Sequence, residues 1–134
     1  IDYGRLCLPG SDELLRKLKA DGHTLALATI SDRKKVDQVI SQCHWEGLFS
    51  YITTLDDVSR SKPDPEIYLT VLERLGLDPQ ETVVIEDSLI GIQAAHDAGL
   101  KVICRRERRM PMPQPDADWY IDDLREAVAL IENL

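Results

Sequence analysis

The chain has few cysteines and no long apolar run. Its 134 residues include three cysteines, which are widely spaced and form no CxxC pair. This pattern argues against a disulfide framework and a zinc site and favours a reducing cytoplasm. No segment approaches the roughly 18 consecutive apolar residues that a membrane span needs, and nothing at the start resembles a signal peptide. We therefore expect a cytoplasmic globular protein without a membrane partner.

Basic residues are also scarce. The chain has 16 Lys and Arg against 24 Asp and Glu, a formal net charge of −8, which disfavours nucleic acid as the main partner. No GxGxxG fingerprint follows any predicted strand, which excludes a dinucleotide-binding domain. The length fits one domain, and we expect residues 1–134 to belong to it.

Short apolar strands alternate with amphipathic helices along the chain. Strands are predicted at residues 24–29, 51–54, 82–85, 101–104 and 119–121. Helices are predicted to begin near Ser11, Asp32, Asp64, Ser88 and Asp123. The alternation indicates an α/β fold, a doubly wound parallel sheet with right-handed crossovers.

Two adjacent carboxylates follow the apolar strand at residues 82–85. Glu86 and Asp87 stand at its carboxyl end, and Ser88 can cap the helix that comes next. Ligands bind at this edge of an open α/β sheet. Two carboxylates there repel each other unless a cation or a hydrogen-bond network holds them, so Mg²⁺ is the natural partner. In the alternative interpretation Asp87 helps Ser88 cap the helix and Glu86 is solvated.

Two further polar residues precede predicted helix starts. Thr29 ends the strand at residues 24–29, where a hydroxyl and unpaired backbone N–H groups can hold a phosphate. Lys62 offers a compact positive charge just before another helix. Taken alone, Thr29 is better explained as a structural residue at a strand end, and Lys62 as a solvated side chain.

Taken together, these segments carry a family resemblance. LALATIS, SKPDPEIY and VIEDSLIGIQAAHDAG resemble, in order and spacing, the second, third and fourth motifs of the haloacid dehalogenase (HAD) superfamily of phosphatases and phosphomutases. The resemblance extends from about Leu8 to Asp122. A Glu directly before the Asp of the fourth motif is more similar to the β-phosphoglucomutase-like and sugar-phosphate phosphatase branch.

The resemblance implies a role for each motif residue. Thr29 would hydrogen-bond the oxygens of the transferring phosphoryl group, and Lys62 would neutralise them and steady the nucleophile. Asp87 would bind Mg²⁺ directly. Glu86 would be a second metal ligand or would orient a metal-bound water.

The same resemblance bears on the substrate. Ser31 and Arg33 correspond to positions that contact the distal phosphate of a phosphosugar in the mutases. Asp32 lies where those mutases tend to carry a basic residue, which speaks against mutase-type recognition.

The nucleophile of the family is missing. Its first motif, DxDx followed by Thr or Val after an apolar strand, does not occur here. The adjacent pairs Asp56-Asp57 and Asp122-Asp123 would point to opposite faces of a strand and cannot replace it. The usual cap domain is absent as well. We therefore expect a partial HAD core that lacks the central first-motif strand and is inactive alone, completed by an N-terminal segment or by a second copy.

The leading hypothesis is the C-terminal core portion of a Mg²⁺-dependent phosphohydrolase. Its substrate would be a small phosphorylated metabolite and its intermediate an aspartyl-phosphate. The alternatives are a non-catalytic module that binds phosphate or metal for regulation, and a fragment of a phosphosugar mutase.

Overall fold

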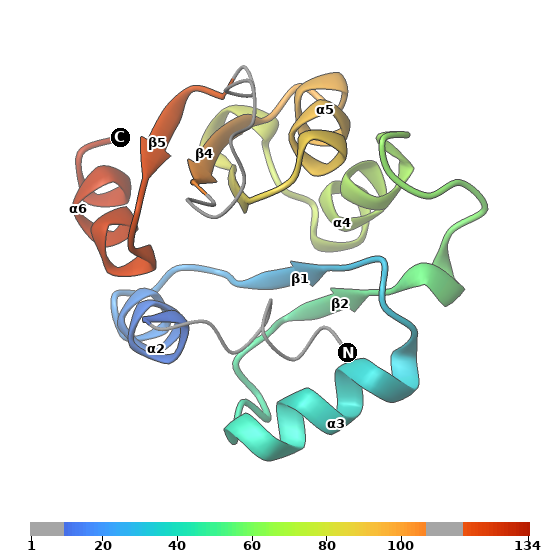
Figure 1. Ribbon diagram of the computed structural model, residues 1–134, viewed down its shortest axis with the longest axis horizontal. Helices are drawn as coiled ribbons and strands as arrows, with labels where there is room; N and C mark the ends of the chain where they lie inside the picture. Colours follow the sequence, from blue (N-terminus) through green and yellow to red (C-terminus); the bar gives the residue numbers. More distant parts are fainter. Residues whose placement is uncertain (1–9, 107–116) are drawn as a thin grey trace. The chain divides into compact units, whose positions relative to one another are not determined.

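The computed structural model describes residues 10–106 and 117–134 of the chain (Figure 1). The chain divides into two units, Ile1–Val58 with Asp123–Leu134, and Ser59–Asp122. Each unit has its own parallel sheet and helices, and each is described by itself below.

The first unit is built on two short parallel strands. Its elements are α2 (Ser11–Ala20), β1 (Ala26–Ala28), α3 (Arg33–Cys43), β2 (Tyr51–Thr53) and the 3₁₀ helix η1 (Leu55–Asp57), followed near the C-terminus by η3 (Leu124–Glu126) and α6 (Ala127–Glu132). β1 and β2 run side by side, with Ala26 opposite Tyr51 and Ala28 opposite Thr53 (Figure 1). α6 and η3 pack on α2.

The core of this unit forms around Trp45. The buried side chains of Val39, Trp45 and Leu48 form one cluster, and the Phe49 ring meets the indole edge to face. The indole N–H donates to Asp12 Oδ1 at 2.8 Å, so the polar end of this large side chain keeps a partner. This contact joins α2 to the segment that follows α3.

The second unit is a three-stranded parallel sheet with helices. Its elements are α4 (Glu66–Leu75), the 3₁₀ helix η2 (Pro79–Glu81), β3 (Val83–Glu86), α5 (Leu89–Asp97), β4 (Lys101–Arg105) and β5 (Trp119–Ile121). The strand order is β3-β4-β5, with Val83 opposite Lys101 and Glu86 opposite Cys104. α5 packs against β4 and β3, and α4 packs against α5.

The predicted helix signals are largely present. Asp32 caps α3 by accepting a hydrogen bond from the Lys35 amide, and Ser88 caps α5 by accepting one from the Gly91 amide. Asp64 marks the next helix start less directly. Its Oδ1 accepts from the Glu66 amide, but α4 begins at Glu66.

The strands confirm the parallel α/β architecture, with one difference in pairing. All strand pairs are parallel, as predicted. In the described residues, however, the strands form two sheets, β1-β2 and β3-β4-β5, so β1 has only β2 beside it and β3 has only β4.

Two sequence expectations concern membrane-spanning helices and cysteines rather than the fold. None of the helices in the described part of the chain is long and apolar enough to cross a membrane. Cys104 is a buried free thiol.

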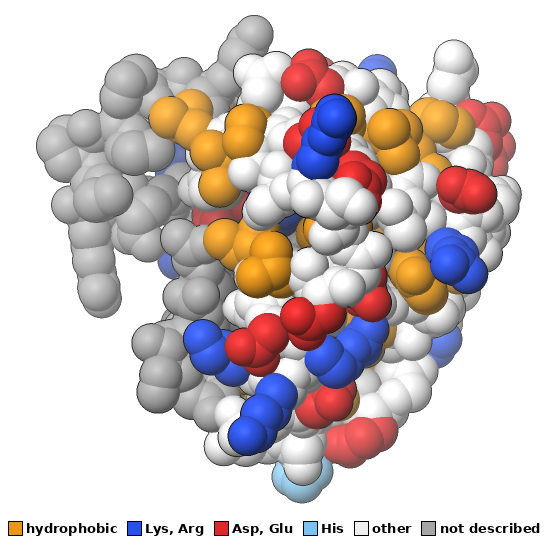
Figure 2. Space-filling view, turned by 90° about the vertical axis from the view of Figure 1, so that its right-hand side faces the viewer, with side chains coloured by type: hydrophobic (Ala, Val, Ile, Leu, Met, Phe, Trp, Pro, Cys, Tyr) orange, Lys and Arg blue, Asp and Glu red, His pale blue; other side chains and the backbone are white. Residues whose placement is uncertain are grey.

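Exposed charges are well mixed. Figure 2 shows Lys and Arg side chains lying beside Asp and Glu side chains on the face it draws. Typical pairs are Arg16–Asp12 and Lys17–Asp21, each 3.0 Å apart and one helical turn apart along α2 or its end. Such exposed pairs contribute little to stability.

Candidate functional site

The carboxyl end of β3 leads directly into α5. Glu86 is the last residue of β3, Asp87 follows it, and Ser88 is the N-cap of α5. The Ser88 hydroxyl accepts the Gly91 N–H at 3.1 Å. The cap is thus made by Ser88, while Asp87 stands between strand and helix, at the sheet edge that binds ligands in α/β folds.

Glu86 is the centre of a buried polar cluster. Its Oε2 accepts hydrogen bonds from Lys62 Nζ and from the Tyr68 hydroxyl, both at 2.8 Å. Its Oε1 accepts the Asp87 N–H at 3.0 Å and the Ser88 hydroxyl at 3.4 Å. Only 8% of the Lys62 side chain and 11% of the Glu86 side chain are exposed. The structure therefore brings Lys62, Glu86 and Asp87 together, and the solvated interpretations of Lys62 and Glu86 are wrong.

The hydrogen bonds decide the charge of Glu86. Burial alone would raise the pKa of this carboxyl, but the Lys62 charge and the hydrogen bonds from Lys62, Tyr68 and the Asp87 amide hold the pKa below its usual value. Glu86 is therefore ionised at neutral pH. Burial also raises the pKa of the Tyr68 phenol, and the negative charges of Glu86 and Asp87 raise it further. Tyr68 is consequently a hydrogen-bond donor throughout the working range of pH.

Gly91 gives the Glu86 side chain its space. A methyl group at position 91 would overlap the Glu86 carboxyl group and its Cγ. Gly91 lies inside α5, where glycine costs about 1 kcal/mol relative to alanine. The close approach of the carboxyl group gives a physical reason for glycine at this position.

Cys104 lies opposite Glu86 in the sheet register. Burial raises the pKa of its thiol, and the negative charges of Asp87 and Glu86 raise it further. The thiol is thus protonated at neutral pH and is not a candidate nucleophile.

The second predicted half of the site lies in the first unit, at the end of β1. The Thr29 amide donates to the Thr53 carbonyl at 3.0 Å, which extends the β1-β2 pairing by one bond. The Thr29 hydroxyl oxygen accepts the Ser31 N–H at 3.1 Å. Because a hydroxyl can accept and donate together, Thr29 keeps a proton that it can donate to an anion. Ser31 lies next to it in the same turn.

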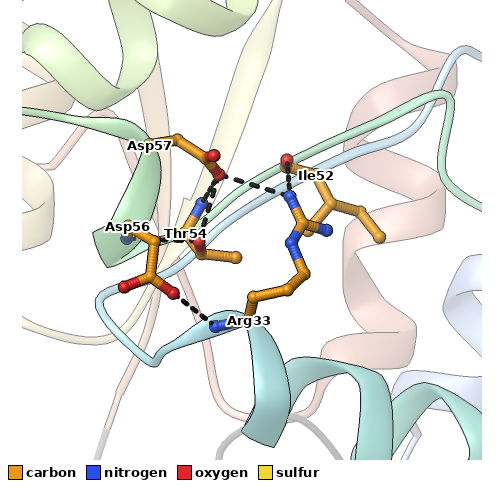
Figure 3. A network of polar contacts seen from close by, with 5 residues as sticks. All are labelled: Arg33, Ile52, Thr54, Asp56 and Asp57. Carbon is orange, nitrogen blue, oxygen red and sulfur yellow. Dashed lines mark hydrogen bonds and ion pairs between the residues drawn. The ribbon is translucent and has the colours of Figure 1, made fainter.

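Arg33 has protein partners in this structure. Its guanidinium Nη2 donates to the Ile52 carbonyl at 2.9 Å and to Asp57 Oδ2 at 3.2 Å. Its backbone N–H donates to Asp56 Oδ2 at 3.1 Å. Figure 3 shows these contacts linking the start of α3 to β2 and η1. The predicted contact of Arg33 with a distal phosphate stays a prediction, and the observed role is to join these three elements.

Sequence reasoning missed this network, which we call the η1 network: Arg33, Ile52, Thr54, Asp56 and Asp57 (Figure 3). Asp57 Oδ2 also accepts from the Thr54 N–H at 2.8 Å and from the Thr54 hydroxyl at 3.0 Å. Asp56 and Asp57 lie in the 3₁₀ helix η1 and not along a strand. The available signal was Thr54 followed by Asp57, which has the spacing of a capping box.

A DxD spacing at residues 116–118 was also overlooked. Asp116 lies outside the described residues. Asp118 Oδ2 accepts the Val102 N–H at 2.8 Å and lies 3.1 Å from His96 Nε2. Asp118 stands just before β5, at the amino end of a strand parallel to β3 through β4. It is therefore at the opposite edge of this sheet from Glu86 and does not replace the missing nucleophile motif.

Glu86 and Asp87 are the two carboxylates at the end of β3 that could hold a magnesium ion. Oxygen ligands suit this hard cation, and the Asp87 carboxylate supplies them. Both Glu86 oxygens already accept hydrogen bonds from protein groups. Within residues 10–106 and 117–134 no group of three or more His, Cys, Asp or Glu side chains could hold a metal ion. The carboxylate of Asp87 is therefore of the type that binds Mg²⁺. Glu86, in its present contacts, instead holds Lys62 in place.

Comparison with known proteins agrees with the motif order. The family model "Haloacid dehalogenase-like hydrolase" matches residues 6–104. The bifunctional riboflavin kinase/FMN phosphatase of Arabidopsis thaliana is 44% identical over 97 residues, 72% of this chain and 26% of that protein. The phosphorylated carbohydrates phosphatase of Thermotoga maritima is 41% identical over 95 residues, 71% of this chain and 44% of that protein.

A solved structure matches the fold as well. The crystal structure of CbbY from Rhodobacter sphaeroides in complex with phosphate superposes with a TM-score of 0.81 at 32% identity, covering 88% of this chain and 54% of that one. The chain thus spans between a quarter and just over half of the length of these proteins. The family match covers most of the chain and contains all of the motif residues, and the chain belongs to the haloacid dehalogenase-like hydrolase family.

Proposed function

We propose that the protein containing this chain is a Mg²⁺-dependent phosphohydrolase that acts on a small phosphorylated metabolite, a sugar phosphate being the first candidate. The observation that carries the proposal is the buried contact of 2.8 Å between Lys62 Nζ and Glu86 Oε2, directly beside Asp87 at the end of β3. A fixed positive charge beside a carboxylate at this edge is what phosphoryl transfer requires. The relatives named as phosphatases of FMN and of phosphorylated carbohydrates support the substrate class.

The residues of this chain would stabilise the phosphoryl group in transfer. Thr29, with Ser31 in the same turn, would donate hydrogen bonds to its oxygens. Lys62 would neutralise their charge, and Glu86 would hold Lys62 in place. Asp87 would hold Mg²⁺, which when bound offsets the negative charge of the phosphate. Glu86 as a direct metal ligand stays a prediction, and its present contacts favour the holding of Lys62.

The nucleophile would come from outside these 134 residues. An aspartate of the family's first motif would attack phosphorus, the ester P–O bond would break, and the leaving alcohol would take a proton. Water would then hydrolyse the aspartyl-phosphate. This chain alone, a single partial core domain at residues 1–134, is expected to be inactive.

The strand pairing supports a missing central strand. In the described residues β1 pairs only with β2 and β3 only with β4. A strand at the edge of a sheet is a template for pairing with a further strand. We expect the strand that carries the first motif to pair with β1 and with β3, supplied by an N-terminal segment or by a second copy, and the cap domain to lie outside this chain.

One observation bears on each of the two alternatives. The missing first motif also fits a non-catalytic regulatory module that binds phosphate or metal. A phosphosugar mutase is disfavoured because Asp32, where the mutases tend to carry a basic residue, caps α3 through the Lys35 amide. A cytoplasmic location stays a prediction.

The test uses the protein expressed from its complete coding sequence. Phosphate release is measured with p-nitrophenyl phosphate and a panel of sugar phosphates, with Mg²⁺ and with EDTA. We expect Mg²⁺-dependent turnover that falls at least about a hundredfold in Asp87→Asn. Asp37→Asn, an exposed carboxylate on α3, is the matched control. Full activity in Asp87→Asn contradicts the proposal, and phosphate binding without turnover supports the regulatory alternative.

A further inference from the structure

We propose that Tyr68 is a positioning residue of the phosphoryl-transfer site: its hydroxyl fixes Glu86, and Glu86 fixes Lys62. The inference rests on the proposed function, because the value of a fixed Lys62 comes from the charge that it places on the phosphoryl group. Tyr68 itself need not touch the substrate.

The geometry shows two donors on one oxygen. Lys62 Nζ and the Tyr68 hydroxyl each lie 2.8 Å from Glu86 Oε2. The Asp87 N–H holds the other oxygen at 3.0 Å. A carboxylate bound at both oxygens has lost the freedom to rotate, so its direction toward Lys62 is set by its neighbours.

The chemistry of the three side chains makes each contact necessary. An ammonium group only donates and a carboxylate only accepts, so Lys62 and Glu86 can pair with each other. A buried carboxylate oxygen with one donor still has capacity for another, and an unsatisfied buried acceptor is costly. The phenol supplies that donor from α4, and only 7% of Tyr68 is exposed.

The ring of Tyr68 also contacts Lys62. Lys62 Nζ lies 5.2 Å from the ring centroid, within the range of a cation–π interaction. Tyr68 thus contacts the lysine through its ring face and the glutamate through its hydroxyl. Phenylalanine would keep the ring and its packing and would lose only the hydrogen bond, which separates a positioning role from a packing role.

Gly91 lies on α5, and the α5 backbone there limits the conformations that the Glu86 side chain can adopt. The Glu86 carboxyl group occupies the space in which a side chain at position 91 would lie. The glutamate is thus confined by a hydrogen-bond donor on α4 and by the bare backbone of α5. A single conformation of Glu86, and hence of Lys62, follows from this confinement.

The experiment compares Tyr68→Phe with Tyr51→Phe, a half-buried tyrosine on β2, in the protein expressed from its complete coding sequence. Turnover of p-nitrophenyl phosphate gives kcat and KM separately. NMR of protein labelled with ¹⁵N-lysine gives the Lys62 ammonium signal, identified by its loss in Lys62→Met. We expect Tyr68→Phe to lower kcat roughly tenfold with KM changed less than about twofold, and to speed solvent exchange of the Lys62 ammonium protons. Tyr51→Phe should change neither.

The outcomes separate this inference from the proposed function. An unchanged Lys62 signal and an unchanged kcat in Tyr68→Phe overturn the positioning role. A changed Lys62 signal, in a protein that hydrolyses no phosphate ester in any form, upholds the positioning role and overturns the phosphohydrolase. If Tyr68→Phe does not fold, the unmodified protein gives a second measurement: we expect a slowly exchanging Tyr68 hydroxyl proton, and rapid exchange of that proton overturns the inference.

Discussion

Lys62 and Glu86 form an ion pair in which both side chains are almost fully buried, 8% and 11% exposed. The pair Arg16–Asp12 is also close, yet its side chains are 48% and 56% exposed. The exposed pair is screened by water and contributes little. Removing one partner of the buried pair leaves a charge without compensation, which is strongly unfavourable.

We predict that Lys62→Met lowers the free energy of unfolding by about 3 kcal/mol, because the buried Glu86 charge loses its partner. Urea denaturation of the complete protein at neutral pH measures the change. Lys34→Met, which replaces an exposed lysine on α3, is the matched control and should change stability by less than about 0.5 kcal/mol. Equal effects of the two substitutions would show that the pair is not a stabilising contact.

We predict that Gly91→Ala destabilises the protein although alanine is the better helix former. The added methyl group displaces the Glu86 carboxyl group from Lys62 and Tyr68. A double-mutant cycle with Glu86→Ala isolates this effect. When position 86 is already alanine, Gly91→Ala should be neutral or stabilising by up to about 1 kcal/mol. The same loss in both backgrounds would contradict the steric explanation.

The Asp57 carboxylate makes stability depend on pH. The hydrogen bond from the Thr54 amide, followed by the Thr54 hydroxyl and Arg33, holds the pKa of Asp57 below its ordinary value. Because the folded pKa is lower than the unfolded one, about 3.9, ionised Asp57 stabilises the fold fully above that pH. This stabilisation is lost as pH falls through the folded pKa.

We therefore expect Asp57→Asn to cost about 1 kcal/mol near pH 7, since the side chain is partly exposed. The cost should shrink as pH falls below about 4 and be lost as pH falls through the folded pKa. Thermal unfolding from pH 2 to pH 7 measures it. Asp37→Asn, which alters an exposed carboxylate on α3, should show no such trend. A cost in Asp57→Asn that is independent of pH would contradict the charge-based explanation.

The sequence predicted local structure better than it predicted contacts between residues far apart in the chain. Asp32 and Ser88 were predictable caps because capping depends on residues within one turn. Gly76 ends α4 with a φ of 62° for the same local reason. The η1 network was not predictable, since Arg33 and Asp57 lie 24 positions apart in the sequence and meet only when the chain between them has folded.

The candidate site shows the same difference between local features, which the sequence predicts, and long-range contacts, which it does not. Lys62, Glu86 and Asp87 were singled out because their motifs have a fixed order, and the structure places Lys62 and Glu86 in contact. Tyr68 was assigned only to the buried stripe of its helix, because the 3.6-residue period reports burial and says nothing of what the hydroxyl contacts. Its bond to Glu86 needed the packing of α4 against α5.

The last prediction concerns residues 1–134 produced alone. Among the described residues β1 pairs with β2 and β3 pairs with β4, so both β1 and β3 stand at the edge of their described sheets. We expect this segment to aggregate, to pair with itself, or to unfold without a sharp transition, and to gain cooperativity when a peptide carrying the first-motif strand is added. Sedimentation and urea unfolding measure both. A monomeric, cooperative transition of ordinary stability, about 5 kcal/mol or more, would contradict the missing-strand proposal, because a domain that lacks its central strand is expected to be much less stable.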